Sequence, residues 1–157
     1  MAMNKNILIK YESKEFQKQV PVKKVINWME SIISELDLHK NTSVSIYFTS
    51  NEIIQELNQK YLNKDYPTDV LSFSQMEGEN ADFIESHFLG DIIISVPFAL
   101  RSAHDKNQEP ILEIYFLLLH GLLHLIGYDH ENDHSNEKAM MDIQYQLFTK
   151  LTGVYFE

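Results

Sequence analysis

The sequence predicts an α+β domain in which a mixed four-stranded sheet is packed with about five helices. Four short stretches alternate apolar and polar residues or are continuously apolar, as strands are. Five longer stretches repeat apolar residues with the helical period. The elements follow in the order β-α-β-α-β-β-α-α-α, which is the pattern of an α+β fold. At 157 residues, we expect one domain over residues 1–157.

The N-terminal third predicts two strands and the helix between them. Residues 6–11 (NILIKY) and residues 43–48 (SVSIYF) alternate and predict the first two strands. Pro21 suits the first turn of a helix that runs to about Leu38. Trp28 lies on the apolar stripe of that helix, and we therefore expect it in the core.

The second helix begins after Thr49 or Ser50, because either side chain can accept a hydrogen bond from the first helical turn. Residues 63–67 break this helix. The helical period predicts a stripe that consists of Ile53, Ile54, Leu57 and Tyr61.

Two further strands follow directly on each other. Residues 69–74 (DVLSFS) and residues 88–95 (FLGDIIIS) predict the third and fourth strands. The polar, acidic residues 75–87 between them predict a long loop that can lie beside a site. Gly90 interrupts the fourth strand, which indicates a β-bulge or a close approach of another backbone.

Three helices complete the chain. We predict a short helix over residues 97–106, a long apolar helix over residues 110–126 and a last helix over residues 136–151, capped by Asp133 or Ser135. The long helix is apolar nearly all round and must therefore be the central one. The last helix has an apolar stripe that we expect in the core, and it consists of Met140, Ile143, Leu147 and Leu151.

The composition limits the class of protein. The chain has no cysteine, which excludes disulfides and thiolate metal ligands. Its first residues hold no apolar run typical of a signal peptide, and no segment reaches the roughly 18 apolar residues of a membrane span. We therefore expect a cytoplasmic protein without a membrane partner.

The net charge of −10 is unusual for a protein that binds nucleic acid, but the charge is unevenly distributed. Nine lysines and seven acidic residues precede Asp65, whereas four basic and sixteen acidic residues lie from Asp65 onward. Arg101 is the only arginine in the sequence. Any contact with RNA would therefore depend on lysines, which lack the two-pronged geometry of arginine.

Three histidines at the end of the long apolar helix predict a metal site. His120 and His124 are four residues apart, so a helix places both imidazoles on one face. Gly127 stands where the helix would end in a left-handed turn, after which the chain could bring His130 over the same ion. Three neutral imidazoles with an open fourth position are the ligands of a catalytic Zn²⁺. They also suit Ni²⁺ and other transition metals.

A zinc ion held in this way lowers the pKa of a water ligand to about 7, which predicts a hydrolase. The spacing HxxxHxxGxxH also occurs in the metzincin metallopeptidases, and a peptidase is therefore one alternative. In a metzincin, a glutamate that serves as general base follows the first histidine. Here that residue is Gly121, which has no side chain to accept a proton.

Three blocks of sequence between Leu57 and His130 occur in the order of a known family. One block is residues 120–130 (HGLLHLIGYDH), and another is residues 89–95 (LGDIIIS). The remaining block consists of Leu57, Asn58, Tyr61, Lys64, Asp65 and residues 67–73 (PTDVLSF). Together these blocks resemble the bacterial YbeY endoribonuclease family, the rRNA maturation factors. Several long motifs that agree at once make the resemblance specific.

The resemblance implies a zinc-dependent endoribonuclease that is specific for single-stranded RNA. It implies that His120, His124 and His130 hold the ion in a cleft near residues 90–95. The expected substrate is the 16S rRNA precursor, and the expected partner is the small ribosomal subunit. The expected processes are 3′-end maturation of small-subunit rRNA, ribosome biogenesis and ribosome quality control. DNA is not an expected partner.

One position departs from the pattern of the family. The family has an arginine directly after the tyrosine of the block at residues 57–73, whereas Leu62 follows Tyr61 here. A leucine cannot bind a phosphate. Either Lys60 or Lys64 substitutes for the arginine, or Arg101 reaches the site, or this member cleaves RNA poorly. Of these alternatives we favour a lysine.

Two further residues are candidates for the site. Asp129, beside the third histidine, could orient a metal-binding histidine, accept a proton as a general base or cap a helix. Thr68 could contact RNA from a turn beside the cleft, or could only form that turn.

A different class of function is compatible with the same residues. Without the family's arginine, and with an acidic surface, the domain could chiefly be a ribosome-associated assembly factor with a structural metal. A nuclease loses RNA cleavage when a metal-binding histidine is replaced. An assembly factor keeps its association with the ribosome as long as it folds.

Overall fold

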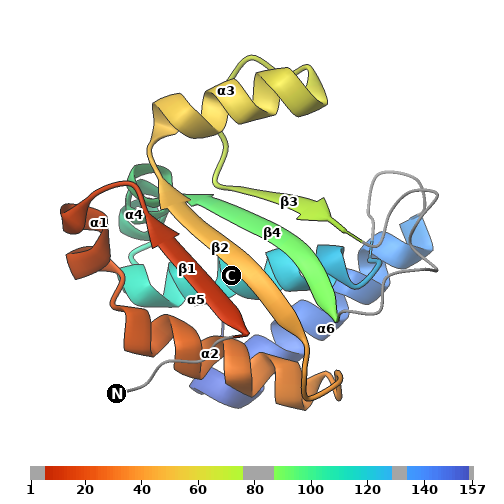
Figure 1. The fold of residues 1–157 in the computed structure, drawn as a ribbon. Helices are drawn as coiled ribbons and strands as arrows, with labels where there is room; N and C mark the ends of the chain where they lie inside the picture. The colour runs from red at the N-terminus through yellow and green to blue at the C-terminus, as the bar shows by residue number, and fades with distance from the viewer. Residues whose placement is uncertain (1–5, 76–86, 129–133, 156–157) are drawn as a thin grey trace.

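The computed structural model describes residues 6–75, 87–128 and 134–155, and it confirms the predicted α+β fold (Figure 1). Within these residues, one mixed four-stranded sheet has the strand order β1-β2-β4-β3. Neighbouring strands β1, β2 and β4 are parallel, whereas β3 runs antiparallel to β4 at the edge. The strands are β1 (Ile7–Tyr11), β2 (Ser43–Thr49), β3 (Val70–Ser74) and β4 (Phe88–Ser95).

Six helices accompany the sheet in the described part of the chain, one more than the sequence predicted. They are α1 (Lys14–Gln19), α2 (Val22–Glu35), α3 (Asn51–Leu62), α4 (Val96–Asp105), α5 (Pro110–Leu125) and α6 (His134–Thr152). The unpredicted helix is α1, which buries none of its side chains and therefore has no apolar stripe to reveal it. No helix in the described ranges is long and apolar enough to cross a membrane.

The helices cover the two faces of the sheet unequally. Helices α2, α5 and α6 lie on one face, and α3 lies on the other (Figure 1). Alternate residues of β4 point to opposite faces, so Ile92 belongs to the main core and Ile93 to a smaller cluster with Ile54 of α3. Nine of the residues of α5 are buried, which confirms that the long apolar helix is the central one.

Two of the predicted apolar stripes were partly wrong. In α3, Tyr61 is 57% exposed, because its ring packs edge-on against Phe73 at the surface instead of entering the core. The buried line of α6 passes through Met140, Gln144 and Phe148. Ile143, Leu147 and Leu151 are only partly buried. Because Gln144 in the middle of this buried line is polar, the line does not show up as a repeat of apolar residues in the sequence.

Gly90 shows both features that its place in the strand indicated. Ser43 of β2 pairs with Phe88, but Ser45 pairs with Asp91, so β4 contains one extra residue at this point. A Cβ atom on Gly90 would lie 2.1 Å from the carbonyl oxygen of Phe73. The prediction of a bulge or a close backbone approach is therefore confirmed on both counts.

Candidate metal centre and cleft

The C-terminal half of α5 carries two histidines whose side chains converge. The Nε2 atoms of His120 and His124 are 3.1 Å apart. Their rings meet edge to face, with centroids 4.6 Å apart and an interplanar angle of 75°. Both residues are half-buried and line the same cleft. When neither Nε2 atom carries a proton, both nitrogens are acceptors and lie close enough together to share one ion.

Helix α5 ends directly after the second histidine in a turn that favours glycine. Gly127 has a φ of +112°. Its amide donates to the His124 carbonyl, and the Tyr128 amide donates to the Leu123 carbonyl, each at 3.1 Å. These two bonds form a Schellman motif, which satisfies the last carbonyls of the helix. The chain beyond this turn includes Asp129 and His130, which lie outside the described residues.

The two histidines fit a metal ion. Two nitrogens bound to one tetrahedral zinc at about 2.0–2.1 Å each are roughly 3.3 Å apart, and the Nε2 atoms of His120 and His124 are separated by 3.1 Å. Imidazole nitrogen is also a ligand that zinc and nickel accept. Across residues 6–75, 87–128 and 134–155, no group of three histidine or acidic side chains gathers as a metal site. A third protein ligand would have to come from elsewhere, and His130 stays a prediction.

The histidine pair lies close to the sheet because Gly121 lets α5 approach β4. A Cβ atom on Gly121 would come within 2.8 Å of Ile92 Cγ2. The Gly121 carbonyl also accepts a hydrogen bond from the Ser72 hydroxyl of β3 at 3.4 Å. A glutamate at this position, as in metzincins, would force the helix away from the sheet. Gly121 therefore has a packing role besides lacking a proton acceptor.

A side chain from another helix contacts the first histidine. Gln144 of α6 is 3% exposed, and its Oε1 atom lies 3.1 Å from Nδ1 of His120. The sequence interpretation missed this residue. The available signal was a polar residue four positions after Met140 and four before Phe148, both of which are buried.

A cleft of about 720 Å³ contains the two histidines. Its lining comes from the end of α3 and the turn after it, from β3 and from the C-terminal part of α5. Three large side chains on this lining are unusually exposed for their type, namely Tyr61 at 57%, Leu62 at 48% and Tyr66 at 52%. The sequence interpretation did not assign Tyr61 or Tyr66 to the cleft surface.

The turn between α3 and β3 is held in place by side chains of α3. Asn58 is buried, and its amide nitrogen donates to the Tyr66 carbonyl at 2.9 Å. The Gln55 amide nitrogen donates to Asp65 Oδ1 at 3.0 Å. Asn63 adopts a φ of +58°, a conformation that asparagine tolerates better than most residues. These contacts fix the wall of the cleft on which Tyr66 stands.

The predicted substrate-binding residues fall in different places. Lys64 and Thr68 line the cleft. Lys60 lies on the exposed end of α3, with its ammonium nitrogen 5.2 Å from the centre of the Tyr61 ring. Arg101 is exposed on α4 and is not among the described residues that line the cleft. The structure therefore brings Lys64 and Thr68 together with the histidines, but not Arg101.

Thr68 begins the turn into β3. Its hydroxyl donates to Asp69 Oδ1 at 3.3 Å, and the same carboxylate oxygen accepts a hydrogen bond from the Val70 amide at 2.7 Å. This geometry accounts for the turn-forming alternative. It leaves the contact with RNA as a prediction.

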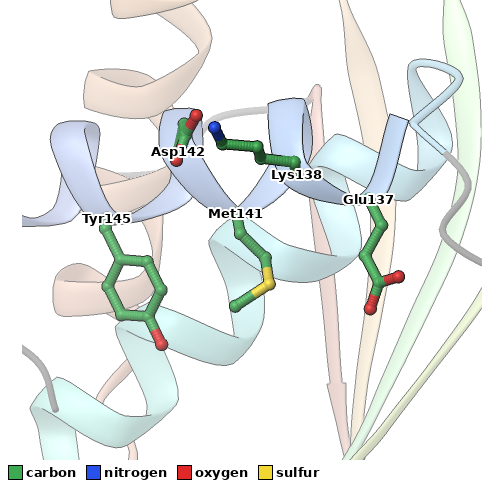
Figure 2. Close-up of a pocket in the computed structure, with 5 residues that line it drawn as sticks. All are labelled: Glu137, Lys138, Met141, Asp142 and Tyr145. Atoms are coloured by element: carbon green, nitrogen blue, oxygen red, sulfur yellow. The ribbon is translucent and has the colours of Figure 1, made fainter. Parts of the chain in front are cut away.

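A second hollow, of about 320 Å³, lies along α6 (Figure 2). All its lining residues belong to that one helix, and they are Glu137, Lys138, Met141, Asp142 and Tyr145. Two acidic side chains against one lysine do not favour a phosphate, and the lining holds no histidine for a metal. The cleft on the other side of α5 is therefore the candidate site.

A buried carboxylate lies two turns before the histidines on α5. Glu113 is 1% exposed and forms an ion pair with Lys106, whose Nζ atom is 3.2 Å from Oε1. Burial raises the pKa of Glu113, the Lys106 ammonium lowers it, and the negative charge of Asp69 raises it further. Glu113 is not among the described residues of the cleft lining, and we assign it no direct contact with a substrate.

Two imidazoles that face each other in a cleft are compatible with a metal ion, but they do not by themselves define a class of enzyme. A comparison with protein families identifies the class. The family model described as Endoribonuclease YbeY matches residues 7–152. The chain therefore belongs to the YbeY endoribonuclease family and is a hydrolase of the nuclease class.

Individual relatives agree with this assignment. An Endoribonuclease YbeY of Sulfurihydrogenibium sp. (strain YO3AOP1) is 41% identical, and the match covers 96% of this chain and 91% of the relative. An Endoribonuclease YbeY of Syntrophus aciditrophicus (strain SB) is 38% identical, with 96% and 92% covered. A solution structure of a Thermotoga maritima protein has a TM-score of 0.63 at 29% identity, with 94% and 89% covered.

Proposed function

We propose that this protein is a zinc-dependent endoribonuclease that cleaves single-stranded RNA. Its substrate would be the 16S rRNA precursor on the small ribosomal subunit, in the cytoplasm, at the stage of 3′-end maturation. This step would give the protein its part in ribosome biogenesis and ribosome quality control. The observation that carries the proposal is the converging pair of His120 and His124 in the cleft of a YbeY family member.

Residues of this chain would hold the ion through imidazole nitrogens. His120 and His124 supply two of them from a rigid, buried helix, and His130 would supply the third. When bound, the ion would act as a Lewis acid and would lower the pKa of a water molecule. Ni²⁺ is also compatible with this ligand set. Asp129 remains the candidate for orienting a histidine or accepting a proton.

The exposed aromatic residues of the cleft support an unpaired RNA substrate. Tyr61 and Tyr66 present about half of their surface to solvent on the cleft lining. Bases stack on tyrosine rings in many proteins that bind single strands, and only unpaired bases are able to do so. We therefore assign Tyr66, with Tyr61, to the binding of bases next to the cleavage position.

Lysines would contact the RNA phosphates in place of the family's arginine. Among the described residues that line the cleft, Lys64 is the only lysine or arginine. The Lys60 ammonium lies over the Tyr61 ring, at the rim of the same wall. Leu62 adds only apolar surface. Phosphate binding in this protein would therefore depend on single-point lysine contacts, which are weaker than a two-pronged arginine contact.

The proposal is tested with purified protein and a short single-stranded RNA, with and without a metal chelator. The variants are His120→Ala and, as the matched control, His104→Ala, which removes an exposed histidine of α4. We expect the chelator and His120→Ala each to abolish cleavage, and His104→Ala to cleave like the wild type. RNA cleavage that survives both the chelator and His120→Ala would contradict a metal-dependent nuclease.

A ribosome-associated assembly factor with a mainly structural metal is the second candidate. The described cleft lining has only one lysine to contact RNA phosphates, which favours an assembly factor over a highly active nuclease. It predicts that His124→Ala lowers the thermal stability while ribosome association and rRNA processing persist wherever the variant still folds. Loss of rRNA processing in a folded, ribosome-bound His124→Ala variant would contradict it.

The metzincin-like peptidase is the weakest of the three candidates. Gly121 provides no general base, and its contact with Ile92 leaves no space for one. A peptidase would hydrolyse casein, and we expect the purified protein to leave casein intact.

A further inference from the structure

Gln144 lies where a buried amide is costly unless its polar atoms are hydrogen-bonded. It is 3% exposed in α6, between Met140 and Phe148, which are 1% and 0% exposed. An apolar side chain at this position would continue the buried line of the helix. The polar residue therefore needs partners inside the protein.

The two partners of Gln144 are both on α5. Its Nε2 atom donates to the Phe116 carbonyl at 3.4 Å, and its Oε1 atom lies 3.1 Å from His120 Nδ1. A carbonyl oxygen can only accept, so the amide nitrogen must face Phe116 and the amide oxygen must face His120. An amide oxygen in turn accepts only from a nitrogen that carries hydrogen. His120 is therefore held in the tautomer with its proton on Nδ1.

This tautomer prepares His120 for a metal. With the proton on Nδ1, Nε2 of His120 is the acceptor atom, and it faces His124 Nε2 at 3.1 Å. In the absence of a metal, the His124 Nε2–H group is then the donor between the two rings. To bind a metal through Nε2, neutral His124 would have to carry its proton on Nδ1 instead, whereas His120 would already have both the required tautomer and the required ring orientation.

We propose that Gln144 is the positioning residue of the metal centre, which fixes the tautomer and the ring orientation of His120 through its amide oxygen. The proposal rests on the metal site of the proposed function. Partners behind metal-binding histidines contribute strongly to metal affinity in other proteins. A purely structural Gln144 would join α5 to α6 but would not affect the tautomer of His120.

The first measurement uses the metal-free full-length protein with ¹⁵N-labelled histidine, at a pH well above the ordinary histidine pKa of about 6.5. The imidazole nitrogen chemical shifts report which nitrogen carries the proton. We expect Nδ1–H for His120 in the wild type, and a shift towards Nε2–H in Gln144→Met, which keeps the length of the side chain but removes the acceptor. An Nε2–H tautomer of His120 in the wild type overturns the proposal, whatever the variants do.

The second measurement is the affinity for Zn²⁺, by competition with a chromophoric chelator. We expect Gln144→Met to bind Zn²⁺ about tenfold to a hundredfold more weakly than the wild type. Gln144→Glu retains an acceptor oxygen towards His120 but loses the donor to the Phe116 carbonyl, so we expect a Zn²⁺ affinity between those of Gln144→Met and the wild type. A higher Zn²⁺ affinity in Gln144→Glu than in Gln144→Met would show that the acceptor oxygen matters, and not only the volume of the side chain.

The packing control is Met140→Ala, which loosens the same buried line of α6 but keeps the Gln144 amide. We expect it to lower the melting temperature while the affinity for Zn²⁺ stays that of the wild type. Equal losses of Zn²⁺ affinity in Met140→Ala and Gln144→Met overturn the proposal, because they show an effect of packing alone. If Gln144→Met does not fold, the proposal is still tested by the tautomer of His120 in the wild type and by the Zn²⁺ affinity of Gln144→Glu.

His120→Ala makes this proposal separable from the proposed function. Zn²⁺ binding by the wild type that does not depend on His120 contradicts the metal site, and with it the proposed function. The tautomer of His120 in the metal-free protein still decides the role of Gln144 in that case.

Discussion

The two sides of the cleft are built in opposite ways. On one side, α5 is a central buried helix, and its histidines are held by the Gln144 amide, the Gly127 turn and the contact of Gly121 with Ile92. On the other side, the end of α3 and the turn after it expose Tyr61, Leu62 and Tyr66. We refer to these as the helix side and the turn side.

The difference indicates a division of labour between reaction and recognition. Residues that bind a metal must be held within a fraction of an ångström, which requires buried partners on every side. Residues that bind a flexible RNA strand need exposed rings and charges instead. Substitutions on the helix side should therefore affect stability and metal binding, whereas those on the turn side should affect RNA affinity alone.

The largest effect is expected from Gly121→Ala on the helix side. The added Cβ would lie 2.8 Å from Ile92 Cγ2, and overpacking of this kind costs about 1–3 kcal/mol of unfolding free energy. Denaturant unfolding measures this loss. Ile92→Ala removes the atoms that clash, so we expect its own cost to be smaller in the Gly121→Ala background than in the wild type.

The control for this double-mutant cycle is Ile94→Ala, which truncates another buried isoleucine of β4. Its cost should be the same with Gly121 or alanine at position 121. Additive costs for Ile92→Ala would show that Gly121 does not set the distance between α5 and β4.

The helix side could be predicted from the sequence further than the turn side, for a physical reason. The spacing of His120 and His124, the turn at Gly127 and the bulge at Gly90 follow from rules that involve a few neighbouring residues. The burial of a helix face depends instead on which distant element packs there. The helical period alone therefore placed Tyr61 on the apolar stripe of α3, although its side chain is exposed at the cleft surface.

Gln144 could not be assigned a partner from the sequence for the same reason. Its contact with His120 joins residues 24 positions apart, across two helices whose relative placement no local rule supplies. What the sequence does contain is a polar residue on a line of buried ones. Such a residue indicates a hydrogen-bonded role inside the protein, without naming the partner.

An effect of comparable size, but on RNA affinity instead of stability, is expected from Tyr66→Ala on the turn side. Loss of a base that stacks on the ring costs about 1–3 kcal/mol, or roughly fivefold to 150-fold in the Kd for single-stranded RNA. Tyr66→Phe keeps the ring and should bind like the wild type. Because the Tyr66 side chain is half exposed, the unfolding free energy should change little.

The matched control is Tyr155→Ala, which removes an exposed tyrosine near the C-terminus that is not part of the described cleft lining. It should leave the affinity for RNA unchanged. If Tyr66→Ala binds RNA as tightly as the wild type, the turn side is not the base-binding wall.

A smaller effect is expected from the single lysine of the described cleft lining. The association constant for RNA falls as the salt concentration rises. In Lys64→Gln, the plot of log K against log salt should become less steep by about 0.7, because one phosphate contact is lost. Leu62→Arg should change the slope in the opposite direction and tighten binding. Titrations of fluorescent RNA at several salt concentrations measure both slopes.

Lys23→Gln serves as the control, because it removes an exposed lysine of α2, a helix that contributes no residue to the described cleft lining. Its salt slope should equal that of the wild type. Equal slopes for Lys64→Gln and Lys23→Gln would mean that Lys64 does not replace the family's arginine.

The smallest expected effect is on the pH dependence of the unfolding free energy, and it involves one carboxylate on each side of the cleft. Glu113 is buried on the helix side, and the charge of Asp69 on the turn side contributes to raising its pKa, after burial itself. The stability contributed by protonated Glu113 is fully present below its ordinary pKa of 4.5 and is lost as the pH rises through the raised value. Lys106 partly offsets this loss, although its own exposure allows solvent to screen the pair.

Glu113→Gln cannot ionise and isolates this contribution. We expect the unfolding free energy of the wild type, relative to this variant, to fall as the pH rises above the ordinary carboxyl pKa of 4.5. Glu56→Gln, which replaces an exposed carboxylate of α3, is the matched control for the loss of one negative charge. Parallel pH profiles for the wild type and Glu113→Gln would mean that the helix side holds this carboxylate without a net cost, and that the contrast between the two sides does not extend to their charges.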